Sequence, residues 1–372
     1  MTVIGTMNIR EHITPRQLFV IVFVLQLGIQ MFMLPYGKSW STGLENMLII
    51  LSAALVSQLL LVLLWVFGAR GYRMNLYTWL TSRLSRVVSV TILFLLAIYF
   101  ACSALVDTLY LTNTVRIWVL STTPSFVLLV VFIAIGAYGA GSSLQSIANI
   151  SQTVIFAIAI IGVLLIILIM REWDLKMILP IWHVGEHNVI SVWLRCCSAF
   201  TAFELLLYAF PLLNKNDRRK GLIAVTWANW LSALLYLMGT AVSFLLYTTE
   251  QMHSITNPLF FAMKKLHNGL IQGIDMIAIC LWILVLLIRT MMCLFMAAKA
   301  IDHLSRQEQH KHELWSWIVA GCCLIPGYFV TKHEWIDQLV GYRLNTTLIL
   351  MGLMTIVFFA AYKRGTAARG TG

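Results

Sequence analysis

Charged side chains are scarce in this chain. Asp, Glu, Lys and Arg make up only 11% of its 372 residues, whereas hydrophobic residues make up 60%. Because soluble domains carry about 25% charged residues, the composition excludes an ordinary soluble domain and predicts a polytopic membrane protein. The polar connections between the apolar stretches are short. We therefore expect a single membrane domain over residues 1–372, with no separate soluble domain.

Patterns typical of disulfide, metal or catalytic sites are also missing. The seven cysteines include two adjacent pairs but no C-x-x-C spacing, so we expect buried apolar thiols and no disulfides. An H-x-x-E-H match at His183–His187 contains Gly185 and follows Pro180 in a connection, which argues against zinc chemistry. The sequence offers no nucleophile–base pair. We expect no enzyme, no catalytic residue, no metal and no cofactor.

A nucleic-acid surface is absent as well. The net charge is +11, yet no basic stripe with interleaved aromatic residues appears. The first apolar run is too long for a cleaved signal peptide and lacks a small-residue cleavage site. The basic residues cluster instead in alternate loops, which is how membrane topology is set. The partners that the composition predicts are therefore the lipid bilayer and not nucleic acid.

What the chain has in abundance is long apolar stretches. A helix that spans a bilayer needs about 20 mainly apolar residues, and by that measure we expect ten spans. Two outer connections also indicate short non-spanning helices, one within Arg171–Ser191 and one over Leu259–Leu266. The expected spans are Pro15–Tyr36, Leu44–Phe67, Val87–Leu111, Ser125–Ala140, Ile147–Met170, Val192–Leu213, Leu222–Tyr247, Ile271–Ile301, Leu314–Val330 and Leu344–Tyr362.

Ten spans place both termini on one side of the membrane. Basic residues favour the side of the termini by about two to one, which predicts cytoplasmic termini by the positive-inside rule. The basic residues on that side are Arg10, Arg16, Arg70, Arg73, Arg83, Arg86, Lys215, Arg218, Arg219, Lys220, Lys299, Arg306, Lys311, Lys363, Arg364 and Arg369.

The first and sixth apolar stretches are interrupted in a similar way. The first contains Gly28, Gln30 and Pro35, and the sixth contains the segment from Ser198 to Pro211, with an acidic residue inside it. Transporters built from two inverted repeats carry broken helices at equivalent positions of each half, and the substrate lies at the breaks. The alternative for the first stretch is a kinked or closely packed helix.

The charged residues within the apolar stretches include Glu204, Arg289 and Asp107. Glu204 lies roughly 18 Å down the sixth stretch, close to mid-bilayer, where a carboxylate marks a functional site or else a structural ion pair. Arg289 lies roughly 27 Å along the eighth, where it either extends to the inner interface or pairs with Glu204. Asp107 falls near the expected outer end of the third stretch, so we expect it to be solvated.

Taken in order, these motifs resemble a known family, the B subunits of bacterial spore germinant receptors. That family is similar to amino-acid permeases of the amino acid–polyamine–organocation superfamily, which have the leucine-transporter fold. The motifs that carry the resemblance are Ile13-Thr14-Pro15-Arg16-Gln17, Leu27-Gly28 to Leu34-Pro35, Phe200–Glu204 with Pro211, and Leu281-Trp282-Ile283-Leu284 leading to Ala297-Ala298.

The resemblance implies an all-α integral membrane protein of two inverted five-helix repeats, about residues 14–170 and 192–363, with helices 1 and 6 broken. It also implies a sensor in the spore inner membrane or cytoplasmic membrane. The sensor binds a small nutrient, such as an amino acid, and works with a membrane A subunit and a C-subunit lipoprotein. A secondary amino-acid transporter, proton-coupled through Glu204, is the alternative.

Two positions depart from the family pattern. Gln30 stands where the family usually has a second glycine, and Ala202-Phe203 stands where a glycine usually precedes the acidic residue. These changes narrow the space for a ligand backbone, so either the ligand is not a simple amino acid or binding is weak. The ligand-binding residues that we expect are Gly28, Ile29, Gln30, Ser103, Phe200, Thr201, Phe203, Glu204, Arg289 and Thr290.

Overall fold

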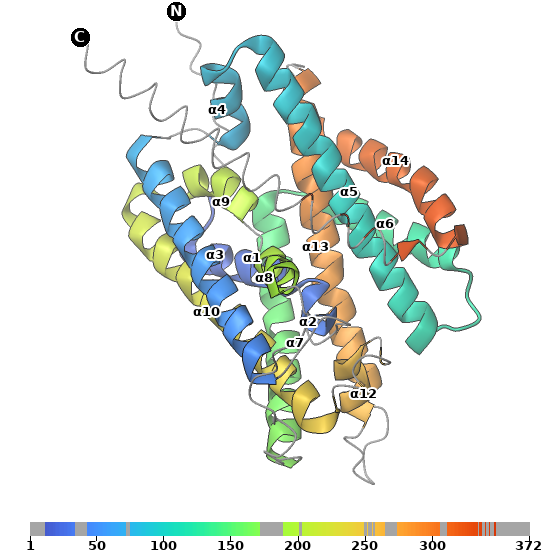
Figure 1. Cartoon of the computed structure of the whole chain (residues 1–372). Helices are drawn as coiled ribbons and strands as arrows, with labels where there is room; N and C mark the ends of the chain where they lie inside the picture. Colours follow the sequence, from blue (N-terminus) through green and yellow to red (C-terminus); the bar gives the residue numbers. More distant parts are fainter. Residues whose placement is uncertain are drawn as a thin grey trace, which may run out of the picture.

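The computed structural model describes residues 12–33, 43–71, 75–171, 189–200, 203–248, 251, 255, 257–264, 274–305 and 311–333, and positions 335, 336, 339, 342 and 346. The described residues form an all-helical bundle without strands (Figure 1). The α-helices are α1 (Pro15–Leu27), α2 (Gln30–Met33), α3 (Gly43–Gly71), α4 (Leu76–Arg83), α5 (Arg86–Trp118), α6 (Ser125–Ala140), α7 (Leu144–Arg171), α8 (Val189–Ala199), α9 (Phe203–Ala209), α10 (Arg218–Leu246), α12 (Pro258–Lys264), α13 (Ile274–Ser305) and α14 (His312–His333).

Six of these helices are long and apolar enough to cross a membrane: α3, α5, α7, α10, α13 and α14. α1 and α6 are shorter apolar helices. The expected spans two to five and seven to nine therefore correspond to helices, and the first and sixth correspond to pairs of short helices. The tenth expected span, Leu344–Tyr362, falls almost wholly outside the described residues, so the count of ten and the inverted repeats remain predictions.

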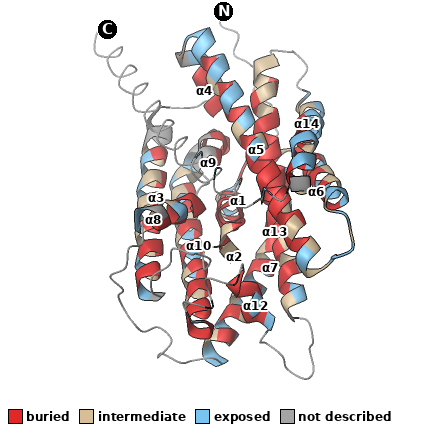
Figure 2. Cartoon of the chain, turned by 45° about the vertical axis from the view of Figure 1, so that its right-hand side comes forward, coloured by how far each residue is buried: buried red, intermediate tan, exposed pale blue. Residues whose placement is uncertain are grey.

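The packing separates central helices from lipid-facing ones. In α10 and α13, 67% of an apolar 18-residue segment of the helix is buried, whereas in α3, α5 and α7 the buried share of such a segment is 39%. On α3 the exposed residues include Leu55, Leu59 and Leu63, which are spaced one helical turn apart and form an apolar outer stripe. Figure 2 shows the buried residues gathered on α13 and around α1, in the middle of the bundle.

The Ile-Thr-Pro-Arg-Gln opening forms a capping box at the start of α1. The Thr14 hydroxyl accepts from Gln17 N (3.2 Å), and Gln17 Oε1 accepts from Thr14 N (2.9 Å). The preceding Ile13 donates its backbone N–H to Leu212 O at 3.2 Å, just after α9. The beginning of the first apolar stretch is thus fastened to the end of the sixth.

Two short helices lie at opposite ends of the bundle (Figure 1). α12, from Pro258, confirms the expected short helix within one connection. α4 was not expected, because the sequence around it is rich in arginine and was assigned to a connection. Its N-cap is Asn75, whose side chain accepts from Thr78 N at 2.9 Å, and it buries apolar residues such as Trp79 against the bundle.

Candidate ligand site at two helix breaks

The first apolar stretch is interrupted where the sequence predicted. α1 ends at Leu27, and α2 begins at Gln30, so the helical hydrogen-bond ladder stops across Gly28 and Ile29. Backbone carbonyls just before such a break lose the amide partners that a continuous helix would supply. Within a membrane, such carbonyls need partners from the protein or from a water-filled cavity.

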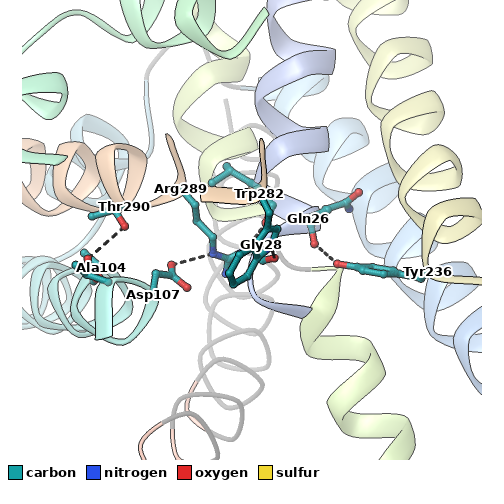
Figure 3. Close-up of polar contacts among 10 residues, drawn as sticks. Gln26, Gly28, Ala104, Asp107, Tyr236, Trp282, Arg289 and Thr290 are labelled. Atoms are coloured by element: carbon teal, nitrogen blue, oxygen red, sulfur yellow. Dashed lines mark hydrogen bonds and ion pairs between the residues drawn. The ribbon is translucent and has the colours of Figure 1, made fainter. Parts of the chain in front are cut away.

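Three side chains satisfy these carbonyls. The Arg289 guanidinium donates through Nη1 to Leu25 O, the Tyr236 hydroxyl donates to Gln26 O, and Trp282 Nε1 donates to Gly28 O at 3.2 Å (Figure 3). Arg289 and Trp282 come from α13, and Tyr236 comes from α10. The break is therefore supported from two central helices.

Arg289 also forms an ion pair inside the bundle. Its Nε lies 2.9 Å from Asp107 Oδ2, with Asp107 fully buried and Arg289 only 7% exposed. Desolvation of each charge is strongly unfavourable unless the other is present. The expected partner, Glu204, lies in α9, and its side chain is outside the described part of the structure. Among the described side chains, the carboxylate paired with Arg289 is that of Asp107.

The expectation that Asp107 is solvated was wrong. The sequence placed the end of the third span at Leu111, because Thr112, Asn113 and Thr114 follow it. α5 continues instead to Trp118, and the Thr114 hydroxyl turns back to donate to Tyr110 O (2.9 Å). Asp107 is thus about 16 Å from the end of its helix at 1.5 Å per residue.

Gly28 allows the close approach of Arg289. A Cβ atom at position 28 would lie 2.6 Å from Arg289 Nη1 and 2.9 Å from its Cδ. Real Cβ atoms essentially never come so near another heavy atom. The absence of a side chain at Gly28 is therefore a condition for the contact between the guanidinium and the end of α1.

The sixth apolar stretch is also broken as predicted. α8 ends at Ala199 and α9 begins at Phe203, with residues 201 and 202 outside the described ones. Phe200 O accepts from Gln26 Nε2 (3.3 Å) and from the Ser57 hydroxyl (3.2 Å). Gln26 thus joins the last turn of α1 to the second break.

Gln26 and its neighbour Asn229 were not among the predicted site residues. Gln26 Nε2 also lies 3.1 Å from Asn229 Oδ1, and Asn229 Nδ2 donates to Ala54 O at 3.1 Å. Both amides are fully buried. The signal was present in the sequence, because each is an isolated amide inside an apolar stretch, where a polar side chain is retained for a structural or functional reason.

Of the other predicted ligand-binding residues, Ile29, Gln30 and Phe200 lie at the two breaks, whereas Thr290 faces α5. Ile29 is buried at the first break, and Gln30 beside it is partly exposed. Phe200 packs edge-on against Tyr236 at 5.4 Å between ring centroids, and the Thr290 hydroxyl lies 3.3 Å from that of Thr108.

The remaining predicted residues divide into two groups. Ser103 is buried on α5, on the same helix as Asp107. Thr201 and the side chains of Phe203 and Glu204 are outside the described part. Ligand binding by the whole set stays a prediction.

A pocket of about 420 Å³ lies at the C-terminal end of α5, apart from the breaks. Its lining includes Tyr110, whose hydroxyl donates to Asn257 Oδ1 at 2.9 Å. None of the predicted ligand-binding residues lies among its described lining. Tyr110 also packs edge-on against Trp282 at 5.8 Å, so one aromatic contact separates this pocket from the residue that caps Gly28.

Side chains that could bind a metal ion are not clustered in the described part of the chain. No group of three or more His, Cys, Asp or Glu side chains is arranged there to hold a metal ion. The H-x-x-E-H match at residues 183–187 falls outside the described residues.

The fold and the two breaks define an integral membrane protein of the permease type, all-helical with discontinuous helices at the centre of the bundle. The chain belongs to the spore germination protein family of spore permeases, whose family model matches residues 12–334. Spore germination protein B2 of Bacillus subtilis (strain 168) is 20% identical to it over 249 residues, which cover 67% of each protein.

Two solved transporter structures have the same fold. A Na⁺-coupled sialic acid symporter in a substrate-bound, outward-open state has a TM-score of 0.66 at 14% identity, covering 95% of this chain and 78% of its own. A nucleobase-cation-symport-1 family transporter in a closed conformation, with bromovinylhydantoin bound, has a TM-score of 0.64 at 15% identity, covering 92% and 75%. At these identities the likeness shows the leucine-transporter-like fold alone. These relatives are permeases and transporters, and not enzymes.

Proposed function

We propose that this protein is the ligand-binding membrane subunit of a bacterial spore germinant receptor. The observation that carries the proposal is the direct link between the two helix breaks, formed by the Gln26 side chain and Phe200 O. Membership of the spore germination family supports the physiological setting. In this setting the chain lies in the spore inner membrane with cytoplasmic termini, and works with a membrane A subunit and a C-subunit lipoprotein.

The proposed ligand is a small nutrient that carries a carboxylate, an amino acid or a similar compound that fits the space narrowed by Gln30. α2 and α9 begin at Gln30 and Phe203, next to the ends of α1 and α8. The first backbone N–H groups of a helix have no partner within it and attract negative charge. Broken helices in transporters use such half-helix N-termini to bind the carboxylate of a substrate.

The test compares ligand ranking in wild type and Gln30→Gly. Purified protein is screened by thermal stability against amino acids, nucleosides and sugars. Removal of the amide widens the first break, so we expect a changed ranking with a bulkier ligand preferred, at about 1 kcal/mol of lost helix stability. Gln145→Gly, in the first turn of α7, makes the same change away from both breaks and should keep the wild-type ranking. An unchanged ranking in Gln30→Gly contradicts a ligand-site role for this residue.

A secondary transporter is the second candidate, favoured by the fold shared with two symporters. Such a protein would move its ligand through the same breaks, with Glu204 as the proton carrier. Uptake of radiolabelled amino acids into proteoliposomes separates the two. Sustained accumulation identifies a transporter, and saturable binding without accumulation identifies a sensor.

A further inference from the structure

The end of α1 presents the kind of backbone carbonyls that bind cations. Helix C-termini carry partial negative charge on their unpaired carbonyls. In transporters with broken helices, unwound carbonyls and half-helix C-termini coordinate Na⁺ or H⁺ at this kind of position. Here Leu25 O, Gln26 O and Gly28 O each accept a hydrogen bond from a side chain of α10 or α13.

One of these donors is itself a cation. The Arg289 guanidinium reaches Leu25 O with Nη1 while its Nε lies 2.9 Å from the buried Asp107 carboxylate. Arginine stays protonated at any physiological pH and presents its donors in a fixed planar fork. The Arg289 side chain thus brings positive charge to a helix carbonyl and to a carboxylate at the same time. These are the two kinds of oxygen that a metal cation would bind.

We propose that Arg289 is a tethered cation that replaces a bound Na⁺ at the first helix break. Asp107 orients the guanidinium, and Gly28 leaves room for it, since any Cβ there would overlap Arg289 Nη1 at 2.6 Å. A free Na⁺ at the same carbonyls is disfavoured by repulsion from the guanidinium and by the loss of its hydrogen bond. The break therefore keeps its structure without Na⁺.

One consequence of this inference is that ligand binding needs no Na⁺. Only that consequence rests on the proposed function. The cation site itself can be tested without any ligand. A failure to find a germinant would therefore leave this test intact, and a failure here would leave the germinant proposal standing.

The test measures thermal stability of the purified full chain in detergent, with Na⁺ or choline chloride at a matched ionic strength of about 0.15 M. Wild type should unfold at the same temperature in both salts. Arg289→Ala leaves Asp107 and Leu25 O without the guanidinium, so Na⁺ or added methylguanidinium should raise its unfolding temperature by at least about 2 °C over choline. Arg289→Gln is the second variant, which fills more of the space and serves if the alanine variant does not fold.

Two control variants accompany this measurement. Arg289→Ala combined with Asp107→Asn should lose the cation response, because the carboxylate is gone. Arg195→Ala removes an exposed arginine of α8 and should behave as wild type. A saturable Na⁺-specific stabilisation of wild type overturns the proposal. A folded Arg289→Ala or Arg289→Gln variant that responds to neither cation also overturns it, and leaves Arg289 as a structural ion-pair residue.

Discussion

Substitution of Gly28 by alanine tests the packing of the first break directly. The new methyl group would lie 2.6 Å from Nη1, 2.9 Å from Cδ and 3.0 Å from Cζ of Arg289. Because Cδ is contacted as well as the guanidinium, rotation of the side-chain tip alone cannot relieve the overlap. The guanidinium must withdraw from Leu25 O, from Asp107, or from both.

The expected loss follows from those two contacts. Leaving a buried carbonyl without its partner costs about 1–3 kcal/mol, and breaking a buried ion pair costs about 3–5 kcal/mol. The surrounding side chains can relax and recover part of both interactions. We therefore expect Gly28→Ala to lower the free energy of unfolding by about 2–4 kcal/mol. For a chain of 372 residues that corresponds to a fall of roughly 3–5 °C in the unfolding temperature.

The matched control is Gly321→Ala in α14. No atom lies within 4 Å of a Cβ built at Gly321, so the same change there meets open space. Alanine is favoured over glycine inside a helix by up to about 1 kcal/mol, and Gly321→Ala should be neutral or slightly stabilising. The measurement is thermal unfolding of both variants in the same detergent. Equal unfolding temperatures for Gly28→Ala and Gly321→Ala would refute the reasoning.

Three further predictions concern the charged and polar groups around the breaks. Asp107→Asn leaves Arg289 buried without its carboxylate and should lower the free energy of unfolding by about 3–5 kcal/mol, whereas Asp275→Asn, at the start of α13, should change it by less than about 0.5 kcal/mol in the same thermal unfolding assay. Trp282→Phe keeps most of the ring but removes the N–H that caps the break, and a loss of about 1–3 kcal/mol is expected by the same assay. Glu204→Gln should assemble normally yet respond weakly to germinant in spores; a full response removes Glu204 from the candidate site.

The sequence was most informative where physical chemistry leaves few choices. Runs of apolar residues have to be helices in a bilayer, because only a helix or a closed barrel satisfies the backbone there. The interruptions at Gly28 and around Phe200 were predictable for the same reason, since each combines breaking or polar residues with an apolar stretch. α4 was missed because a helix of eight residues with arginines around it has the composition of a loop.

The partner of Arg289 shows where reading a sequence reaches its limit. Depth along a helix was the basis for pairing this residue with Glu204, and depth depends on where each helix ends. Because Thr112, Asn113 and Thr114 follow Leu111, the third span was predicted to end there, and Asp107 was predicted to lie near the membrane surface. α5 continues to Trp118, which places Asp107 well inside the helix.

The pairing of Asp107 with Arg289 depends on which helices are in contact in the fold. α5 and α13 pack along much of their length, so the side chains of Asp107 and Arg289 meet there although 182 positions separate them. No local pattern in either stretch encodes that proximity. Gly28 is a second example of a role that depends on contact between helices. In the sequence, this glycine predicts a break in the helix. In the fold, its missing side chain also leaves room for the Arg289 guanidinium. A substitution that restores helix propensity at this position therefore acts first on the ion pair, and only through it on the break.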